Sequence, residues 1–107
     1  MSRKWIPVAK VDDVPRETCT LRVNHGGEAV CLYLLKDKVY ATQDKCTHGN
    51  ASLSEGYIVD DMIECGLHQG MFDIATGVAR TAPCTVNLTT YPVQVEDGVI
   101  YLEEPAP

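Results

Sequence analysis

Two short segments combine cysteine and histidine at close spacing, Cys46-Thr47-His48 and Cys65-Gly66-Leu67-His68. In an extended backbone, residues i and i+2 point to the same side, so Cys46 and His48 can face one point. A turn can bring Cys65 and His68 together in the same way. Two loops that each offer one thiolate and one imidazole predict a four-ligand metal site.

Two kinds of metal centre fit this donor set. Two cysteines and two histidines can hold a tetrahedral zinc ion. They can also hold a two-iron, two-sulfide cluster in which the cysteines bind one iron and the histidines bind the other. Zinc fingers usually place two cysteines on one loop and two histidines on a helix. Here each loop mixes the two types and no helical pattern follows, which favours the iron–sulfur centre and leaves a structural zinc module as the alternative.

The same two segments, Cys46-Thr47-His48-Gly49 and the run from Cys65 to Gly70, resemble the cluster-binding loops of the Rieske family. Nearly the whole chain is similar to the small Rieske ferredoxins of aromatic-ring-hydroxylating dioxygenases, of the naphthalene and biphenyl type. The further similar segments are 53–57, 63–72, 76–77 and 91–93.

The resemblance implies one Rieske-type [2Fe-2S] cluster and a role for each ligand. Cys46 and Cys65 would bind the inner iron, and His48 and His68 would bind the outer iron near solvent. Imidazole ligands raise the reduction potential relative to a cluster held by four cysteines.

Residues beside the second loop are candidates for covering the cluster and for partner docking. Pro83 matches a proline-bearing loop that shields the cluster in the family, with an ordinary turn proline as the alternative. Leu67, Gln69 and Met71 flank the loop and form a candidate docking rim, although Met71 also fits a core position.

The functional prediction is a one-electron carrier rather than an enzyme. The chain has three histidines and the cluster would use two, so a two-histidine, one-carboxylate oxygenase site cannot be assembled. The sequence contains no Gly-x-Gly-x-x-Gly segment, which is the motif that would indicate a nicotinamide or flavin site. The resemblance implies electron transfer from a flavin-dependent NAD(P)H reductase to a terminal oxygenase that hydroxylates an aromatic ring. A Rieske subunit of another system, such as a nitrite reductase small subunit or a monooxygenase ferredoxin, is the alternative.

Composition narrows the partners and the compartment. The formal net charge of −6 disfavours nucleic acid and favours basic protein partners. The sequence contains no run of about 18 apolar residues that would predict a membrane span. Its first residues lack the apolar region that is typical of a secretory signal. Five cysteines, an odd number, do not suggest a disulfide framework, so the expected compartment is the reducing bacterial cytoplasm.

Strand and turn patterns predict an all-β protein of small antiparallel sheets with the Rieske fold. No segment keeps a 3.6-residue apolar period. Strands are expected near 5–9, 19–24, 29–35, 39–42, 56–60, 62–64, 71–74, 78–79, 89–96 and 99–103. Residues 1–107 should form one domain, with a basal sheet from about 1–42 and 84–107 and a cluster-binding subdomain at about 43–83.

The sequence also predicts how exposed three further side chains are. His25 lies in the turn His25-Gly26-Gly27 and is expected to be exposed and without a metal role. Cys19 and Cys31 lie among apolar residues in strand-like runs and are expected to be buried thiols.

Four positions predict a low reduction potential. Respiratory Rieske proteins of high potential carry a disulfide at positions that match Ala51 and Leu67, and serine and tyrosine hydroxyls at positions that match Gly70 and Phe72. Hydrogen bonds to cluster sulfur stabilise the reduced state, so losing these hydroxyls lowers the potential. We expect a potentiometric titration to give roughly −150 mV, the low end of the Rieske range. A value clearly above zero would contradict this prediction.

Overall fold

The computed structural model describes residues 4–47, 49–66, 70–82 and 84–104. Within these ranges, strands and turns dominate, with two short 3₁₀ helices at Val11–Asp13 and Leu53–Glu55. The strands are β1 (Trp5–Lys10), β2 (Thr20–His25), β3 (Glu28–Leu35), β4 (Lys38–Gln43), β5 (Tyr57–Val59), β6 (Met62–Glu64), β7 (Met71–Asp73), β8 (Ala79–Thr81), β9 (Val93–Glu96) and β10 (Val99–Glu103). The predicted all-β class is confirmed. Over the same residues, no helix has both the length and the apolar character needed to cross a membrane.

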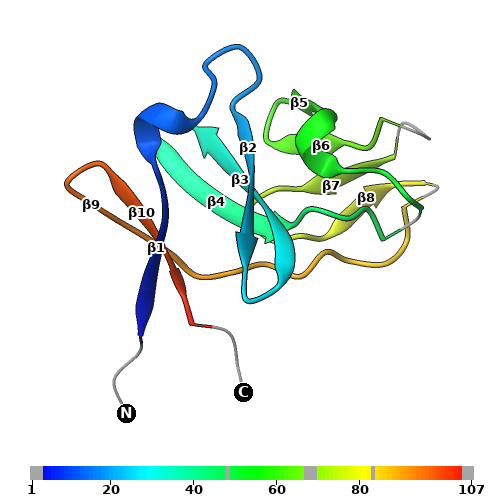
Figure 1. Ribbon diagram of the computed structural model, residues 1–107. Helices are drawn as coiled ribbons and strands as arrows, with labels where there is room; N and C mark the ends of the chain where they lie inside the picture. The colour runs from blue at the N-terminus through cyan, green and yellow to red at the C-terminus, as the bar shows by residue number, and fades with distance from the viewer. Residues whose placement is uncertain (1–3, 48, 67–69, 83, 105–107) are drawn as a thin grey trace.

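The described strands form three small antiparallel sheets, as expected for the Rieske fold. Their strand orders are β1-β10-β9, β2-β3-β4 and β5-β6-β7-β8. Figure 1 shows the β1-β10-β9 sheet at one end, the β5–β8 sheet at the other, and β2–β4 between them. The first and last described residues lie side by side next to the β1–β10 pair, where the Glu104 N–H donates to the Lys4 carbonyl at 2.8 Å.

The central strand β3 separates two apolar cores. Side chains alternate across a strand, so Val30 and Leu32 face one core while Cys31 and Tyr33 face the other. The first core lies toward β10 and consists of Val14, Val30, Leu32, Ala41, Ile100 and Leu102. The second lies toward β5–β8 and consists of Cys31, Tyr33, Cys46, Leu53, Ile63, Cys65, Phe72, Ile74, Cys84 and Leu88. We call this second group the sulfur-bearing core.

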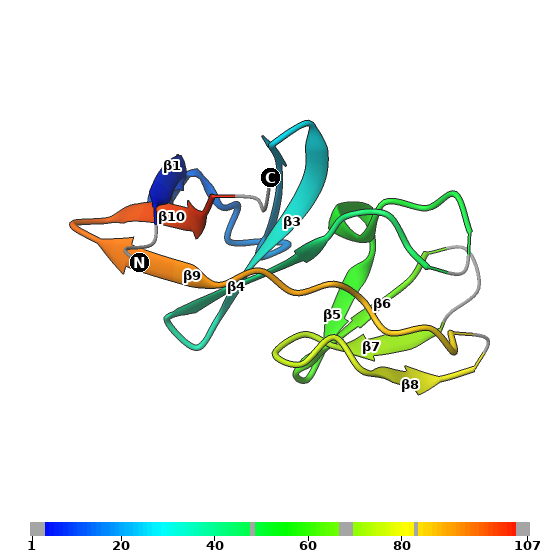
Figure 2. The same cartoon turned by 90° about the horizontal axis from the view of Figure 1, so that it is seen from below.

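The chain between β8 and β9 is hydrogen-bonded to β4 of the central sheet before it enters the β1-β10-β9 sheet, which we call the terminal sheet. Figure 2 shows this orange segment passing beside β4 before it enters β9. The Gln43 N–H donates to the Thr89 carbonyl at 2.9 Å, and the Tyr91 N–H donates to the Ala41 carbonyl at 3.0 Å. The expected single strand at 89–96 is therefore wrong in its first half: residues 89–91 pair with β4, and β9 begins only at Val93.

Two tight hairpin turns follow the sequence prediction. Gly26 and Gly27 between β2 and β3 have φ of 62° and 84°, and Asp97 and Gly98 between β9 and β10 have φ of 51° and 78°. Two consecutive residues with positive φ give the backbone twist that suits a two-residue hairpin, which is why glycine and aspartate are favoured there.

The predicted exposure of His25 is wrong. Its side chain is only 4% exposed, and its Nε2 lies 2.7 Å from the Glu103 carbonyl oxygen of β10. Its ring meets Tyr91 edge-on, with 6.2 Å between the ring centroids. The residue lies beside a turn, but the hairpin folds against the terminal sheet and covers it.

The two cysteines expected to be buried differ. Cys31 is fully buried as predicted, and burial raises the pKa of its thiol to about 12. Cys19 is only half-buried, so the prediction is wrong for this residue; it precedes β2 and has φ of 61°.

Candidate metal centre

The first candidate metal-binding segment follows β4 and is closed by a backbone hydrogen bond. The Cys46 N–H donates to the Ala51 carbonyl at 2.9 Å, and Lys45 pairs with Ser52 in an antiparallel bridge just outside it. The two ends of the segment therefore lie side by side. Cys46 is 2% exposed and packs into the sulfur-bearing core.

A buried carboxylate beside this segment holds the following turn in place. Asp44 Oδ1 accepts the Ser54 N–H at 2.9 Å, and its backbone oxygen accepts the Leu53 N–H at 2.6 Å. Its Oδ2 lies 3.6 Å from Arg22 Nε, and only 2% of the Asp44 side chain is exposed. A buried charge is tolerated when such partners satisfy it. Sequence reasoning missed Asp44 because one polar residue after a strand does not stand out from ordinary loop composition.

The second candidate metal-binding segment joins β6 to β7 and is closed in the same way. The Cys65 N–H donates to the Gly70 carbonyl at 2.8 Å, directly beyond the antiparallel pair Glu64–Met71. Cys65 is 1% exposed and belongs to the same core as Cys46. Both cysteines therefore lie at the mouth of a closed loop, with their side chains in one shared core.

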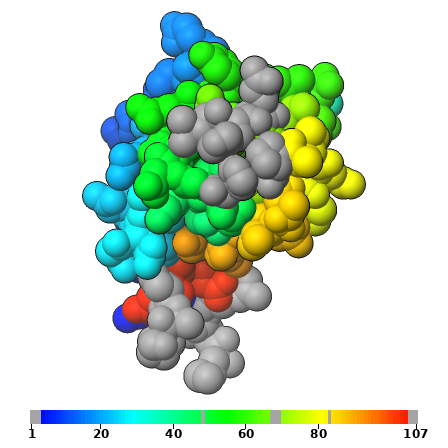
Figure 3. Space-filling model, turned by 90° about the vertical axis from the view of Figure 1, so that its right-hand side faces the viewer, coloured from blue at the N-terminus to red at the C-terminus, as the bar shows by residue number. Residues whose placement is uncertain are grey.

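A third segment, residues 84–88, packs against the other two. The Thr47 hydroxyl donates to the Val86 carbonyl at 2.7 Å, which ties this segment to the first loop. Cys84 is 4% exposed, and its Sγ lies where a Cβ at Gly70 would have to be. Figure 3 looks onto this end of the molecule, where green atoms of residues near 50 and yellow-orange atoms of the later segment lie around one face.

The third segment brings another sulfur beside the two predicted ligands. Burial, together with the neighbouring charges of Cys46 and Cys65, raises the pKa of the Cys84 thiol to about 11. Cys84 is therefore a neutral thiol at physiological pH. No spacing signal marked Cys84, which is a single cysteine after Pro83; only its packing reveals it.

The structure brings together the two predicted cysteine ligands, and their chemistry fits an iron–sulfur centre. Soft thiolates favour iron–sulfide, and both sulfurs lie in one apolar core that excludes water. Met71 begins β7 and is half-buried. The other predicted site residues, His48, Leu67, His68, Gln69 and Pro83, lie outside the described residues. Among those that are described, no group of three or more His, Cys, Asp or Glu side chains is arranged to hold a metal ion.

Comparison with known proteins gives consistent matches over the chain. The family model described as Rieske [2Fe-2S] domain matches residues 4–92. The ferredoxin component of the naphthalene 1,2-dioxygenase system of Pseudomonas putida is 44% identical over 97 residues, which cover 91% of this chain and 92% of that protein. The Sphingomonas yanoikuyae B1 ferredoxin has a TM-score of 0.88 at 37% identity, covering 95% of this chain and 100% of that one. A chain in the complex of reduced oxygenase and oxidized ferredoxin in carbazole 1,9a-dioxygenase has a TM-score of 0.84 at 41% identity, covering 96% of each.

The contact between Gly70 and Cys84 predicts that Gly70→Ala is destabilising. The new Cβ would overlap Cys84 Sγ and lie 3.1 Å from the Thr81 carbonyl oxygen. Overpacking of this kind typically costs about 1–3 kcal/mol. We expect a lower thermal midpoint and faster bleaching of visible absorption on heating, both partly restored by adding Cys84→Ala.

The matched control is Gly66→Ala. A Cβ at Gly66 meets nothing within 4 Å, so this variant should behave like the unmodified protein. Equal effects of the two alanine substitutions, or no recovery in the double variant, would contradict the steric account.

Proposed function

The chain belongs to the Rieske [2Fe-2S] domain family, and we propose that it serves as the ferredoxin of an aromatic-ring-hydroxylating dioxygenase system. It is an electron carrier with one Rieske-type [2Fe-2S] cluster rather than an enzyme, which excludes the structural zinc module. The observation that carries the proposal is the 44% identity to the naphthalene system ferredoxin, which extends over 91% of this chain.

We propose Cys46 and Cys65 as the thiolate ligands, with His48 and His68 as the imidazole ligands. The burial of both cysteines in one core and the mixed cysteine–histidine spacing support this assignment. The bound cluster would supply one-electron redox chemistry. The chain's own contribution is to hold the two sulfurs at fixed positions and to keep water from them.

We further propose the direction of electron flow and the parts of the surface involved. Electrons would arrive from a flavin-dependent NAD(P)H reductase and leave to a terminal oxygenase in the bacterial cytoplasm. The complex of the carbazole ferredoxin with its oxygenase supports the second step, and an odd count of five cysteines suits a reducing compartment. Leu67, Gln69 and Met71 stay candidates for the docking rim, and Pro83 stays the candidate shield. Residues 43–83 stay the proposed cluster-binding subdomain, although Cys84 and Leu88 share its core.

The ligand assignment predicts that His68→Ala and Cys46→Ser each abolish the Rieske spectrum. Each variant lacks one of four ligands, so visible absorption, acid-labile sulfide and the Rieske electron paramagnetic resonance signal should be lost. Far-ultraviolet circular dichroism should still show the terminal sheet, because its core does not contain either residue. The matched cysteine control is Cys19→Ser, which removes a half-buried thiol outside the sulfur-bearing core and should keep the spectrum. An unchanged spectrum in His68→Ala would refute the assignment.

The proposed electron route predicts rapid reoxidation of the reduced protein by a terminal oxygenase. The test is anaerobic stopped-flow mixing of the reduced carrier with the oxidised oxygenase, following the visible bands. The net charge of −6 suggests electrostatic steering by a basic partner, so the second-order rate constant should fall as salt is added.

The Cys46→Ser variant, which lacks the cluster, is the negative control for this experiment. A second acceptor, the catalytic subunit of a nitrite reductase, tests the rival system. Reoxidation by that acceptor and not by the oxygenase would overturn the dioxygenase assignment while leaving the electron-carrier role intact.

A further inference from the structure

Asp44 is the one buried acid of the chain, and it lies beside the candidate metal centre. All fifteen Asp and Glu residues lie within the described ranges, and Asp44 alone among them is buried, with 2% of its side chain exposed. It follows the last residue of β4 and precedes Cys46 by two residues. The net charge of −6 therefore comes from groups that water reaches and screens, with the exception of this one carboxylate.

Backbone hydrogen bonds fix Asp44 between β3 and the sulfur-bearing core. Its N–H donates to the Ala29 carbonyl of β3 at 3.0 Å, and its carbonyl accepts the Leu53 N–H at 2.6 Å. Leu53 and Cys46 are both buried members of the sulfur-bearing core. The carboxylate is therefore held at the edge of the core that contains the candidate ligand cysteines.

The two partners of the carboxylate do not neutralise it completely. Oδ1 accepts the Ser54 N–H at 2.9 Å, which stabilises the ionised form but brings no net charge. Oδ2 lies 3.6 Å from Arg22 Nε, and 59% of the Arg22 side chain is exposed against 2% of the Asp44 side chain. Because water screens the exposed cation more strongly than the buried anion, a net negative potential remains on the protein side of the pair.

The pKa of a neighbouring thiol indicates that this charge reaches into the core. Burial is the largest cause of the raised pKa of Cys31, and the negative charge of Asp44 raises it further. Cys31 belongs to the same core as Cys46 and Cys65. The field that acts on Cys31 would act in the same way on negative charge added at the candidate ligands.

We propose that the buried charge of Asp44 lowers the reduction potential of the metal centre and that Arg22 limits this effect. Reduction adds one electron to the centre, and a fixed negative charge nearby makes that addition less favourable. The inference rests on the ligand set and the one-electron role proposed above. It adds a second cause of a low potential to the missing hydroxyls at Gly70 and Phe72.

Asp44→Asn is predicted to raise the midpoint potential. Asparagine has nearly the same shape, and its amide oxygen can still accept the Ser54 N–H, so the substitution removes the charge and keeps the loop contact. At an effective dielectric constant of about 20, one buried charge should change the equilibrium constant for reduction by about three- to tenfold. At 59 mV per tenfold change for a one-electron couple, that is ~30–60 mV, measured by protein-film voltammetry.

Arg22→Gln is predicted to shift the potential in the opposite direction. It removes the compensating cation, and because that cation is largely exposed, the equilibrium constant should fall by only about twofold, which is ~20 mV. The measurement is made at about pH 8, where carboxyl groups are ionised. Opposite shifts identify an electrostatic effect, since a merely structural role of the pair would move the potential the same way in both variants.

Two comparisons separate the charge of Asp44 from its packing. Asp97→Asn makes the same chemical change in the exposed turn between β9 and β10, outside the sulfur-bearing core, and should leave the potential unchanged. The electron paramagnetic resonance g values of Asp44→Asn should match those of the unmodified protein, because the Ser54 contact and the backbone position of Cys46 are kept.

Several results would overturn the proposal. An unchanged potential in Asp44→Asn, or shifts of the same sign in Asp44→Asn and Arg22→Gln, would show that the pair does not act through its charge. Altered g values in Asp44→Asn would assign its shift to displaced ligands instead. If Asp44→Asn fails to assemble, Arg22→Gln still decides, because a raised or unchanged potential in that variant contradicts the proposal. These results leave the electron-carrier role intact, whereas absence of iron and inorganic sulfide from the unmodified protein would overturn that role and this inference together.

Discussion

Two backbone hydrogen bonds, Cys46 N–H to Ala51 O and Cys65 N–H to Gly70 O, determine where the two candidate ligand cysteines lie. Each bond closes a short loop at its mouth and thereby fixes the backbone of the cysteine that lies there. Both mouths open onto one core, which brings the two sulfurs together although β5 and β6 separate them in the chain. Burying thiolates is unfavourable unless they are paired or metal-bound, so this arrangement suits a chain that binds metal.

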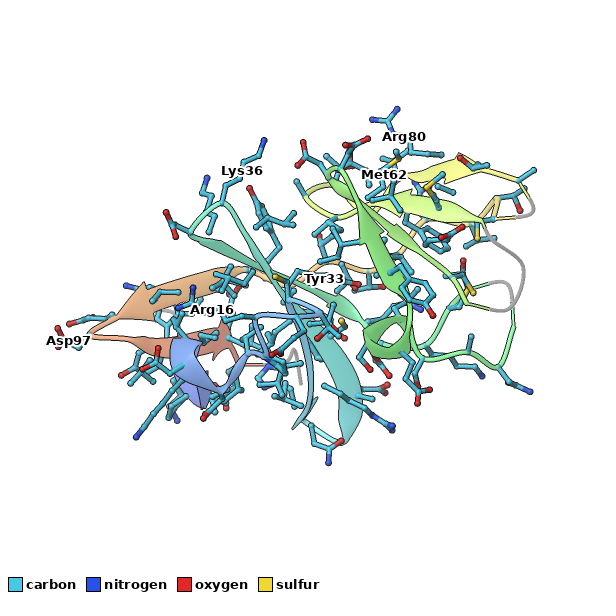
Figure 4. The ribbon with its side chains drawn as sticks, turned by 90° about the horizontal axis from the view of Figure 1, so that it is seen from above. Arg16, Tyr33, Lys36, Met62, Arg80 and Asp97 are labelled. Atoms are coloured by element: carbon cyan, nitrogen blue, oxygen red, sulfur yellow. The ribbon has the colours of Figure 1, made fainter. Side chains whose placement is uncertain are left out.

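The central strand β3 links the metal centre to the rest of the fold. It is buried on both faces, so a single strand supplies Cys31 and Tyr33 to the sulfur-bearing core and Val30 and Leu32 to the other core. In Figure 4, Tyr33 lies near the middle of the molecule, Asp97 lies at the end formed by β9 and β10, and Arg80 lies on the β5–β8 side. The Tyr33 hydroxyl lies 2.8 Å from Thr42 Oγ1 on β4, and burial raises the pKa of this phenol far above its usual value. Each core therefore covers one face of β3.

Local chemistry made much of the fold predictable. The hairpins at Gly26-Gly27 and Asp97-Gly98 need positive φ, and their residue types indicate this directly. Residue type and spacing also predicted that Cys46 and Cys65 lie close together, and both cysteines pack in one core. The predictions that were wrong concern features that depend on contacts between segments far apart in the sequence. His25 looks like a turn residue, but β10 covers it, and the strand into β9 is interrupted because residues 89–91 pair with β4. Asp44 and Cys84 act through packing partners that no local pattern encodes.

Gly70 and Cys84 constrain one another and thereby limit how this centre can be tuned. A side chain at position 70 would occupy the space of the Cys84 sulfur, so a hydroxyl introduced there requires a smaller residue at position 84. The Thr81 carbonyl, which accepts the Cys84 N–H and lies 3.1 Å from the same space, cannot move away without loosening the third segment. The two positions therefore change the packing around the buried cysteines together. A donor on the second loop and a sulfur on the third segment are alternatives, because the core has room for only one of them.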